Sequence, residues 1–159
     1  MGHRRVGREC ALQMLYERDI GAIPDEEILR TYWGMEEYAD KIREFAEQLF
    51  TGVAGRIAEL DQLIQSHAQN WRLSRMAAVD RNVLRLAAFE LLSGGRSPDS
   101  AIINEALELA RKFSTQDSAQ FVNGILDSIR KDLSGKTIRD LQKEHAHGKP
   151  DEHSGTAAE

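Results

Sequence analysis

One stretch, residues 103–127, decides the fold; it reads INEALELARKFSTQDSAQFVNGILD. Apolar residues recur every three or four positions on both sides of a polar corner at residues 114–117, which is typical of two amphipathic helices. Asp117 and Phe121 are four residues apart, so a carboxylate and an aromatic ring are expected on the same side of a helical first turn. Apolar packing explains the two helices but not this corner, so the pair is a candidate binding site.

The corner has two interpretations. Ser114 and Asp117 have the spacing of a capping box, in which the serine accepts from a helical amide and the acidic residue reaches back. Phe121 flanks an inward stripe that includes Val122 and would then belong to the core. In the functional interpretation, Asp117 accepts a hydrogen bond from a nucleobase and Phe121 offers a stacking face. The residues alone leave both open.

The remaining chain repeats the helical period, and no alternation typical of strands is present, so we expect an all-α fold. Gly21 is expected to close the first helix, and Ser74 and Ser97 to cap later ones. The segment 36–69 is either one long helix or two nearly collinear ones with a bend near Gly52 and Gly55. The segment 75–92 has an apolar arc wide enough for the central helix. The expected helices are 3–19, a short one from Pro24, 36–69, 75–92, one from Ser97 to Phe113, and a last one that includes 122–133.

Length and composition favour one folded domain, residues 1–134, with a polar tail at 135–159. We expect a frayed helical turn near 137–144 and disorder beyond it. A net charge of −5 argues against non-specific coating of DNA. The single cysteine, Cys10, has no partner for an internal disulfide, and no apolar run has the length of a membrane span. These features predict a cytoplasmic protein without membrane association.

Arg4, Arg5 and Arg8 open the first helix. Arg4 and Arg8 are spaced to share one face, where they would bridge consecutive phosphates, and Arg5 extends the patch. The alternative is an ordinary solvated helix start. Cations at a helix N-terminus oppose the macrodipole, which favours a functional reason for them. Neutralising three phosphates of single-stranded RNA would give a log–log salt slope of about −2.

Asp80 lies at the edge of the apolar arc of the segment 75–92. A carboxylate there is costly unless it is paired. Its partner is expected to be Arg72 or Arg75 within the chain, or a basic group on another protein. The histidines, including His67, lack the spacing of a metal site, and no phosphate loop or catalytic motif is found. We therefore expect no metal, no cofactor and no enzymatic activity.

Three blocks, taken together, carry a resemblance to a known family. They are RECALQMLYE at 8–17, WRLSRMAAVDRNVLRLAAFELL at 71–92, and the opening stretch with its DSxxFVNGxLD signature at 117–127. In this order and spacing the chain resembles the NusB family of transcription antitermination factors, over residues 4–133. The resemblance implies an all-α fold of six to seven helices in two packed three-helix subdomains.

The resemblance also implies a function. NusB proteins pair with NusE, a small-subunit ribosomal protein, and bind boxA RNA in ribosomal RNA operon leaders to support the transcription elongation complex. By motif, RNA-facing positions are Arg4, Arg5, Arg8, Asp117 and Phe121. Two further positions, Tyr16 and Asp80, face NusE. Gly7 interrupts the basic run, where relatives are often more densely basic, which predicts weak RNA affinity without the partner.

Two other interpretations stay open. A helical adaptor, or a homodimer that hides the RNA face, would use the same surface for protein association alone. An accessory domain of a ribosomal RNA methyltransferase is the third interpretation, although the chain has no room for the catalytic domain.

Overall fold

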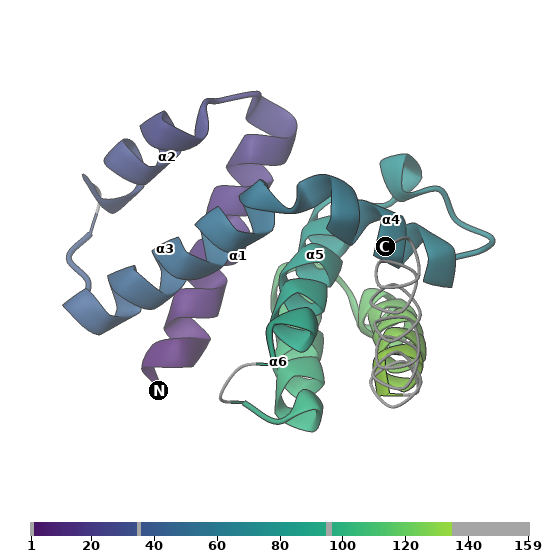
Figure 1. Ribbon diagram of the computed structural model, residues 1–159. Helices are drawn as coiled ribbons and strands as arrows, with labels where there is room; N and C mark the ends of the chain where they lie inside the picture. Colours follow the sequence, from purple (N-terminus) through teal and green to yellow (C-terminus); the bar gives the residue numbers. More distant parts are fainter. Residues whose placement is uncertain (1, 35, 95–96, 135–159) are drawn as a thin grey trace, which may run out of the picture. The chain divides into compact units, whose positions relative to one another are not determined.

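The computed structural model describes residues 2–34, 36–94 and 97–134 (Figure 1). The chain divides into two compact units, Met1–Ile129 and Arg130–Glu159. Within the described ranges all regular structure is helical, which confirms the all-α prediction. In the second unit residues 130–134 are helical, and the expected tail, including the frayed turn at 137–144, lies outside the described residues. None of the described helices is long and apolar enough to cross a membrane.

The helices of the first unit follow one another with short connections. Two 3₁₀ turns, Tyr32–Gly34 and Leu73–Arg75, lie between longer elements. The last helix of this unit comprises residues 116–129. The others are α1 (His3–Gly21), α2 (Asp25–Thr31), α3 (Asp40–Gly55), α4 (Ile57–His67), α5 (Ala78–Ser93) and α6 (Asp99–Phe113).

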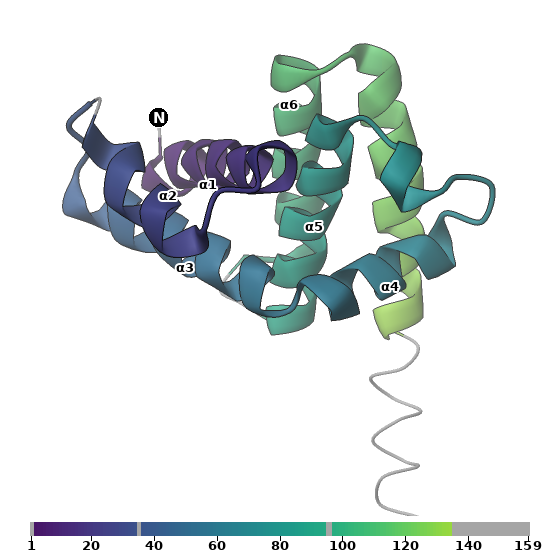
Figure 2. The same cartoon turned by 90° about the horizontal axis from the view of Figure 1, so that it is seen from above.

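Helix α5 is the centre of the unit, as its wide apolar arc predicts. It packs against α6 and also contacts α1, α3 and α4, while α1 packs most closely on α3 (Figure 2). Its side chains Val83, Leu84 and Leu86 are at most 1% exposed. Helices α1, α3, α4 and α6 therefore share α5 as a common packing partner.

The expected long segment 36–69 is two helices, α3 and α4, and the break follows Gly55. Gly52 has a different role from the predicted bend. A Cβ atom at Gly52 would lie 2.2 Å from Cζ of Phe89 on α5, far inside van der Waals contact. The missing side chain therefore permits the close approach of α3 to α5.

Three predicted helix ends are wrong in detail. The left-handed residue that closes α1 is Ala22, with φ of 51°, one position after Gly21. Ser74 lies in a 3₁₀ turn, and α5 begins later, after Ala77, without a side-chain cap. Ser97 precedes the Pro98 N-cap of α6, and its hydroxyl accepts a hydrogen bond from Arg4 instead. Backbone geometry determines the first two of these ends, and a hydrogen bond from a distant helix occupies Ser97 at the third. Local sequence shows neither.

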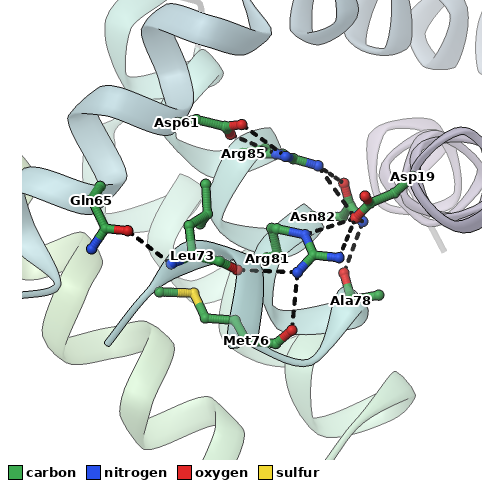
Figure 3. A network of polar contacts seen from close by, with 9 residues as sticks. All are labelled: Asp19, Asp61, Gln65, Leu73, Met76, Ala78, Arg81, Asn82 and Arg85. Carbon is green, nitrogen blue, oxygen red and sulfur yellow. Dashed lines mark hydrogen bonds and ion pairs between the residues drawn. The ribbon is translucent and has the colours of Figure 1, made fainter. Parts of the chain in front are cut away.

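A polar network joins three helices beneath the surface (Figure 3). Asp19 of α1 accepts hydrogen bonds from Arg81 at 2.8 Å and Asn82 at 2.9 Å, both on α5. Arg85 donates to Asp61 of α4 through two nitrogens at 2.7 and 2.9 Å, and it lies 3.4 Å from Asp19. The two arginine side chains are only 10–13% exposed. This network fixes the end of α1 and the start of α4 against α5.

Candidate nucleic-acid interface

The polar corner before the last helix is built from hydroxyl groups. The backbone amide of Ser118 donates to Oγ1 of Thr115 at 3.0 Å, so Thr115 is the capping residue. The Ser118 hydroxyl lies 2.8 Å from that of Ser114 and donates to Oδ2 of Asp80 at 3.0 Å. The corner is therefore tied to the first turn of α5.

This cap replaces the predicted capping box. Ser114 does not receive the helical amide, because the helix begins one residue later than the box requires. Asp117 is exposed and forms no hydrogen bond or ion pair within the described part of the chain. Its carboxylate is consequently available to a ligand.

Phe121 lies one turn after Asp117, and its side chain is only half-buried. Its ring makes an edge-to-face contact with Trp71, with centroids 5.6 Å apart and planes at 77°. Trp71 is 58% exposed. Trp71 is the first residue of the block 71–92 that carries the family resemblance, and it is not among the predicted site residues. The signal that would have found it is the large aromatic residue between polar and basic neighbours in the block 71–92.

The three arginines of α1 have different environments, and burial separates Arg8 from Arg4 although both belong to the same helix. Arg8 is 5% exposed and forms two hydrogen bonds with Glu90 of α5 at 2.8 and 2.9 Å. Arg5 is exposed and pairs with Glu105 of α6 at 2.9 and 3.0 Å. Arg4 is exposed and donates to the Ser97 hydroxyl at 3.2 Å. Of these three arginines, Arg4 alone pairs with no acidic side chain in the described part of the chain.

The ion pair between Arg5 and Glu105 changes both pKa values. Hydrogen bonding to Glu105, reinforced by its charge, raises the pKa of Arg5. The same contact lowers the pKa of Glu105. A phosphate that binds Arg5 must therefore compete with a carboxylate that is ionised at neutral pH.

Asp80 is 7% exposed, and the expected internal pairing with Arg72 or Arg75 is wrong. Its Oδ2 accepts from Ser118, and its Oδ1 is buried without a hydrogen-bond partner among the described residues. Arg72 and Arg75 are exposed, and neither side chain forms an ion pair in the described ranges. They add two uncommitted cations near the corner.

Tyr16, the other residue expected to face NusE, is 38% exposed on α1. It lines a groove of about 620 Å³ with Leu12, Val79 and Phe113. The charged residues that line this groove, Glu17 and Glu36, are both acidic. Beneath this region burial raises the pKa of the Cys10 thiol, and burial also raises the pKa of Tyr38 to about 12.

Fold and surface together define a class of protein. It is a small all-helical protein that presents an unpaired carboxylate, two aromatic rings and exposed arginines at its surface. Such a surface suits a ligand with hydrogen-bonding bases and phosphates.

The chain belongs to the NusB family, whose model matches residues 5–131. Two curated relatives are named transcription antitermination protein NusB. The one from Koribacter versatilis (strain Ellin345) is 43% identical over 136 residues, which cover 85% of this chain and 93% of the relative. The one from Geobacter sulfurreducens (strain ATCC 51573 / DSM 12127 / PCA) is 45% identical over 137 residues, which cover 86% and 99%.

Solved structures agree with this assignment. T. maritima NusB has a TM-score of 0.74 at 36% identity, and the match covers 82% of this chain and 92% of that chain. A crystal structure of the antitermination factors NusB and NusE in complex with dsRNA has a TM-score of 0.74 at 26% identity and covers 82% and 98%. These matches confirm the resemblance, and the names of the relatives agree with the expectation of a protein that is not an enzyme.

Proposed function

We propose that this chain is a cytoplasmic transcription antitermination factor that binds boxA RNA of ribosomal RNA operon leaders together with NusE. In this role it acts on the transcription elongation complex and has no catalytic activity. Family membership supports antitermination, and the solved complex of related factors with NusE and RNA supports the two partners.

One observation carries the proposal. Asp117 is an exposed carboxylate with no hydrogen bond or ion pair to the residues that the structure describes, and Phe121, one helical turn away, is only half-buried. A carboxylate accepts hydrogen bonds from base amino and imino groups, and an aromatic ring stacks on any base. The two side chains together match an unpaired nucleotide.

Arginines of α1 supply the phosphate contacts in this proposal. Arg4 is available directly, and Arg5 becomes available when phosphate displaces Glu105. Arg8 does not contact phosphate in this proposal, because its buried ion pair with Glu90 holds α1 against α5. Each phosphate contact on a single strand contributes about −0.7 to the slope of log affinity against log salt concentration. Two contacts therefore give a slope of about −1.4, shallower than the value of about −2 expected for three.

NusE is proposed to dock on α1 at Tyr16, where the groove has acidic walls. The small-subunit ribosomal protein would present basic residues to Glu17 and Glu36. Asp80 contributes from inside, because its bond to Ser118 links the first turn of α5 to the RNA corner. Its Oδ1 has no hydrogen-bond partner among the described residues and would accept one from a donor of NusE.

The test is a titration of labelled boxA RNA and a scrambled RNA, with and without NusE. The wild-type protein should prefer boxA, and NusE should increase the affinity. Asp117→Ala should weaken boxA binding about tenfold or more, as expected for loss of a hydrogen bond to a charged group. Glu26→Ala, an exposed carboxylate in the first turn of α2, is the matched control and should leave binding unchanged.

The melting temperature separates binding from folding. Asp117→Ala should melt within about 1–2 °C of the wild-type protein, because an exposed residue contributes little to stability. A large drop in melting temperature with unchanged RNA affinity would instead make Asp117 a structural residue. Equal affinity for boxA and scrambled RNA would refute the proposed specificity.

A homodimer that hides the RNA face is the alternative arrangement. Tyr16 and Ile20 are large apolar side chains exposed on α1, 38% and 58% respectively, and they would be covered in such a dimer. Measuring molecular mass with and without NusE and RNA distinguishes the cases. A dimer that persists with RNA bound would exclude occlusion.

A further inference from the structure

We propose that Trp71 and Phe121 form one stacking platform for an unpaired RNA base, flanked by Arg72 and Arg75 as phosphate contacts. This inference rests on the proposed RNA-binding function and extends the site to the loop between α4 and α5. It adds three residues to the positions that the family resemblance supplies.

Ring geometry is the first argument. The two ring planes meet at 77° with centroids 5.6 Å apart, so the rings form two walls of a corner. With 58% of Trp71 exposed, the contact with Phe121 leaves much of the indole open to solvent. A base stacked on the indole would also meet the ring of Phe121. Each stacked base contributes a sequence-tolerant affinity that alanine substitution removes.

The loop that carries Trp71 is held in place by Gln65 of α4. The Gln65 side-chain amide donates to the Trp71 carbonyl oxygen at 2.7 Å and to that of Ala68 at 3.2 Å. Its Oε1 accepts from the Leu73 amide at 2.8 Å (Figure 3). The Trp71 amide donates to the Ala68 carbonyl at 3.0 Å. The backbone of a loop held in this way loses little conformational freedom when a ligand binds.

Charge around the platform favours a polyanion. Arg72 follows Trp71 directly, and Arg75 ends the 3₁₀ turn just before α5. Both are exposed, and no acidic side chain in the described ranges pairs with either. The buried arginines of α5, in contrast, are matched by Asp19 and Asp61. Unmatched cations beside an exposed indole are typical of surfaces that bind single-stranded nucleic acid.

The platform and the polar corner belong to the same surface. Ser118, next to Asp117, is bonded to Asp80 in the first turn of α5, and Phe121 lies one turn further along the last helix. Trp71 contacts that helix directly through Phe121. A nucleotide on the platform therefore lies within reach of the free carboxylate of Asp117.

The test measures the boxA affinity of the chain alone, without NusE, for Trp71→Ala, Trp71→Phe and Ile20→Ala. Ile20 is also 58% exposed and is the matched control for loss of a large apolar side chain. Trp71→Ala should weaken binding about tenfold, Trp71→Phe should retain most of the affinity, and Ile20→Ala should match the wild-type protein. All variants should melt like the wild-type protein.

Fluorescence supplies a second readout. The chain has two tryptophans, so a Trp33→Phe protein reports Trp71 alone. RNA should quench that emission through base stacking. The double variant Arg72→Gln with Arg75→Gln should make the log–log salt slope shallower by about 1.4, from about 0.7 per contact.

The outcomes separate this inference from the proposed function. If Asp117→Ala loses boxA affinity while Trp71→Ala keeps it, the platform is refuted and the proposed function stands. If Trp71→Ala weakens NusE binding but not RNA binding by the chain alone, the loop is a protein contact and the platform is again refuted. If the wild-type protein does not bind boxA above scrambled RNA, both fail.

Discussion

Two pairs of arginines share the same four-residue spacing and have different environments. Arg81 and Arg85 on α5 are both largely buried and both contact Asp19. On α1, Arg8 is buried against Glu90, whereas Arg4 is exposed and pairs with no acid among the described residues. Spacing determines which side chains share a helical face, but acids from distant helices determine which of them are neutralised. The exposed arginines are the candidates for RNA contact, those without an acidic partner directly and Arg5 by displacement of Glu105.

The largest effect is expected when the shared acid of the α5 pair is removed. Asp19→Ala leaves Arg81 without its carboxylate and takes one of two acids from Arg85. Breaking a buried ion pair in this way costs about 3–5 kcal/mol. Urea denaturation should show this loss, and Asp25→Ala, which removes the half-exposed acid paired with Arg18, should cost less than about 1 kcal/mol. Equal losses would contradict a special role of the buried network.

The α1 arginines should separate stability from binding. Arg8→Ala leaves the Glu90 carboxylate, 12% exposed, without its partner, and the free energy of unfolding should fall by about 2–3 kcal/mol. Arg4→Ala should change it by less than about 0.5 kcal/mol and instead weaken boxA binding. Chemical denaturation and RNA titration of both variants test this division. A stable Arg8→Ala protein with impaired RNA binding would return Arg8 to the RNA contacts.

A smaller effect tests whether geometry or charge matters at Arg81. Its guanidinium donates to Asp19 and to the carbonyl oxygens of Leu73 and Met76. Lysine keeps the charge but cannot reproduce this fork, so Arg81→Lys should cost about 1–2 kcal/mol. The melting temperature of the variant, compared with that of the wild-type protein, measures this loss of stability. An unchanged melting temperature would show that charge alone satisfies Asp19.

The smallest effect concerns the exposed pair of Arg5 with Glu105. Because the folded pKa of Glu105 is lowered from 4.5, its stabilisation is complete above that value and disappears as the pH falls through the folded pKa. Glu105→Gln should therefore show a slightly shallower loss of melting temperature on acidification. At neutral pH the same variant frees Arg5, so its boxA affinity should rise. A fall in affinity would mean that Glu105 orients Arg5 for RNA.

Much of the fold follows from the sequence, because apolar periodicity reports helices directly. The period predicted the all-α class and the central position of α5, and it left open whether the segment 36–69 is one helix or two. The helix ends were less predictable. Thr115 caps the last helix in place of Ser114, because adjacent hydroxyl residues compete for the same amides.

The site was predicted only as far as local spacing reaches. Spacing placed Asp117 and Phe121 one turn apart, as the structure has them. It could not show that Glu90, 82 residues from Arg8, neutralises that arginine. It could not place Trp71 against Phe121 either, because the loop folds back through Gln65 contacts that no periodicity encodes.

The bare backbone at Gly52 has a consequence for how the first unit unfolds. The ring of Phe89 occupies the space that a side chain at Gly52 would need, so α3 and α5 are in close contact there. Separating the N-terminal helices from the C-terminal ones would expose that ring and open the Asp19 network at the same time. Both halves would lose buried contacts with α5 on separation, so residues 2–129 are expected to melt cooperatively, in a single transition.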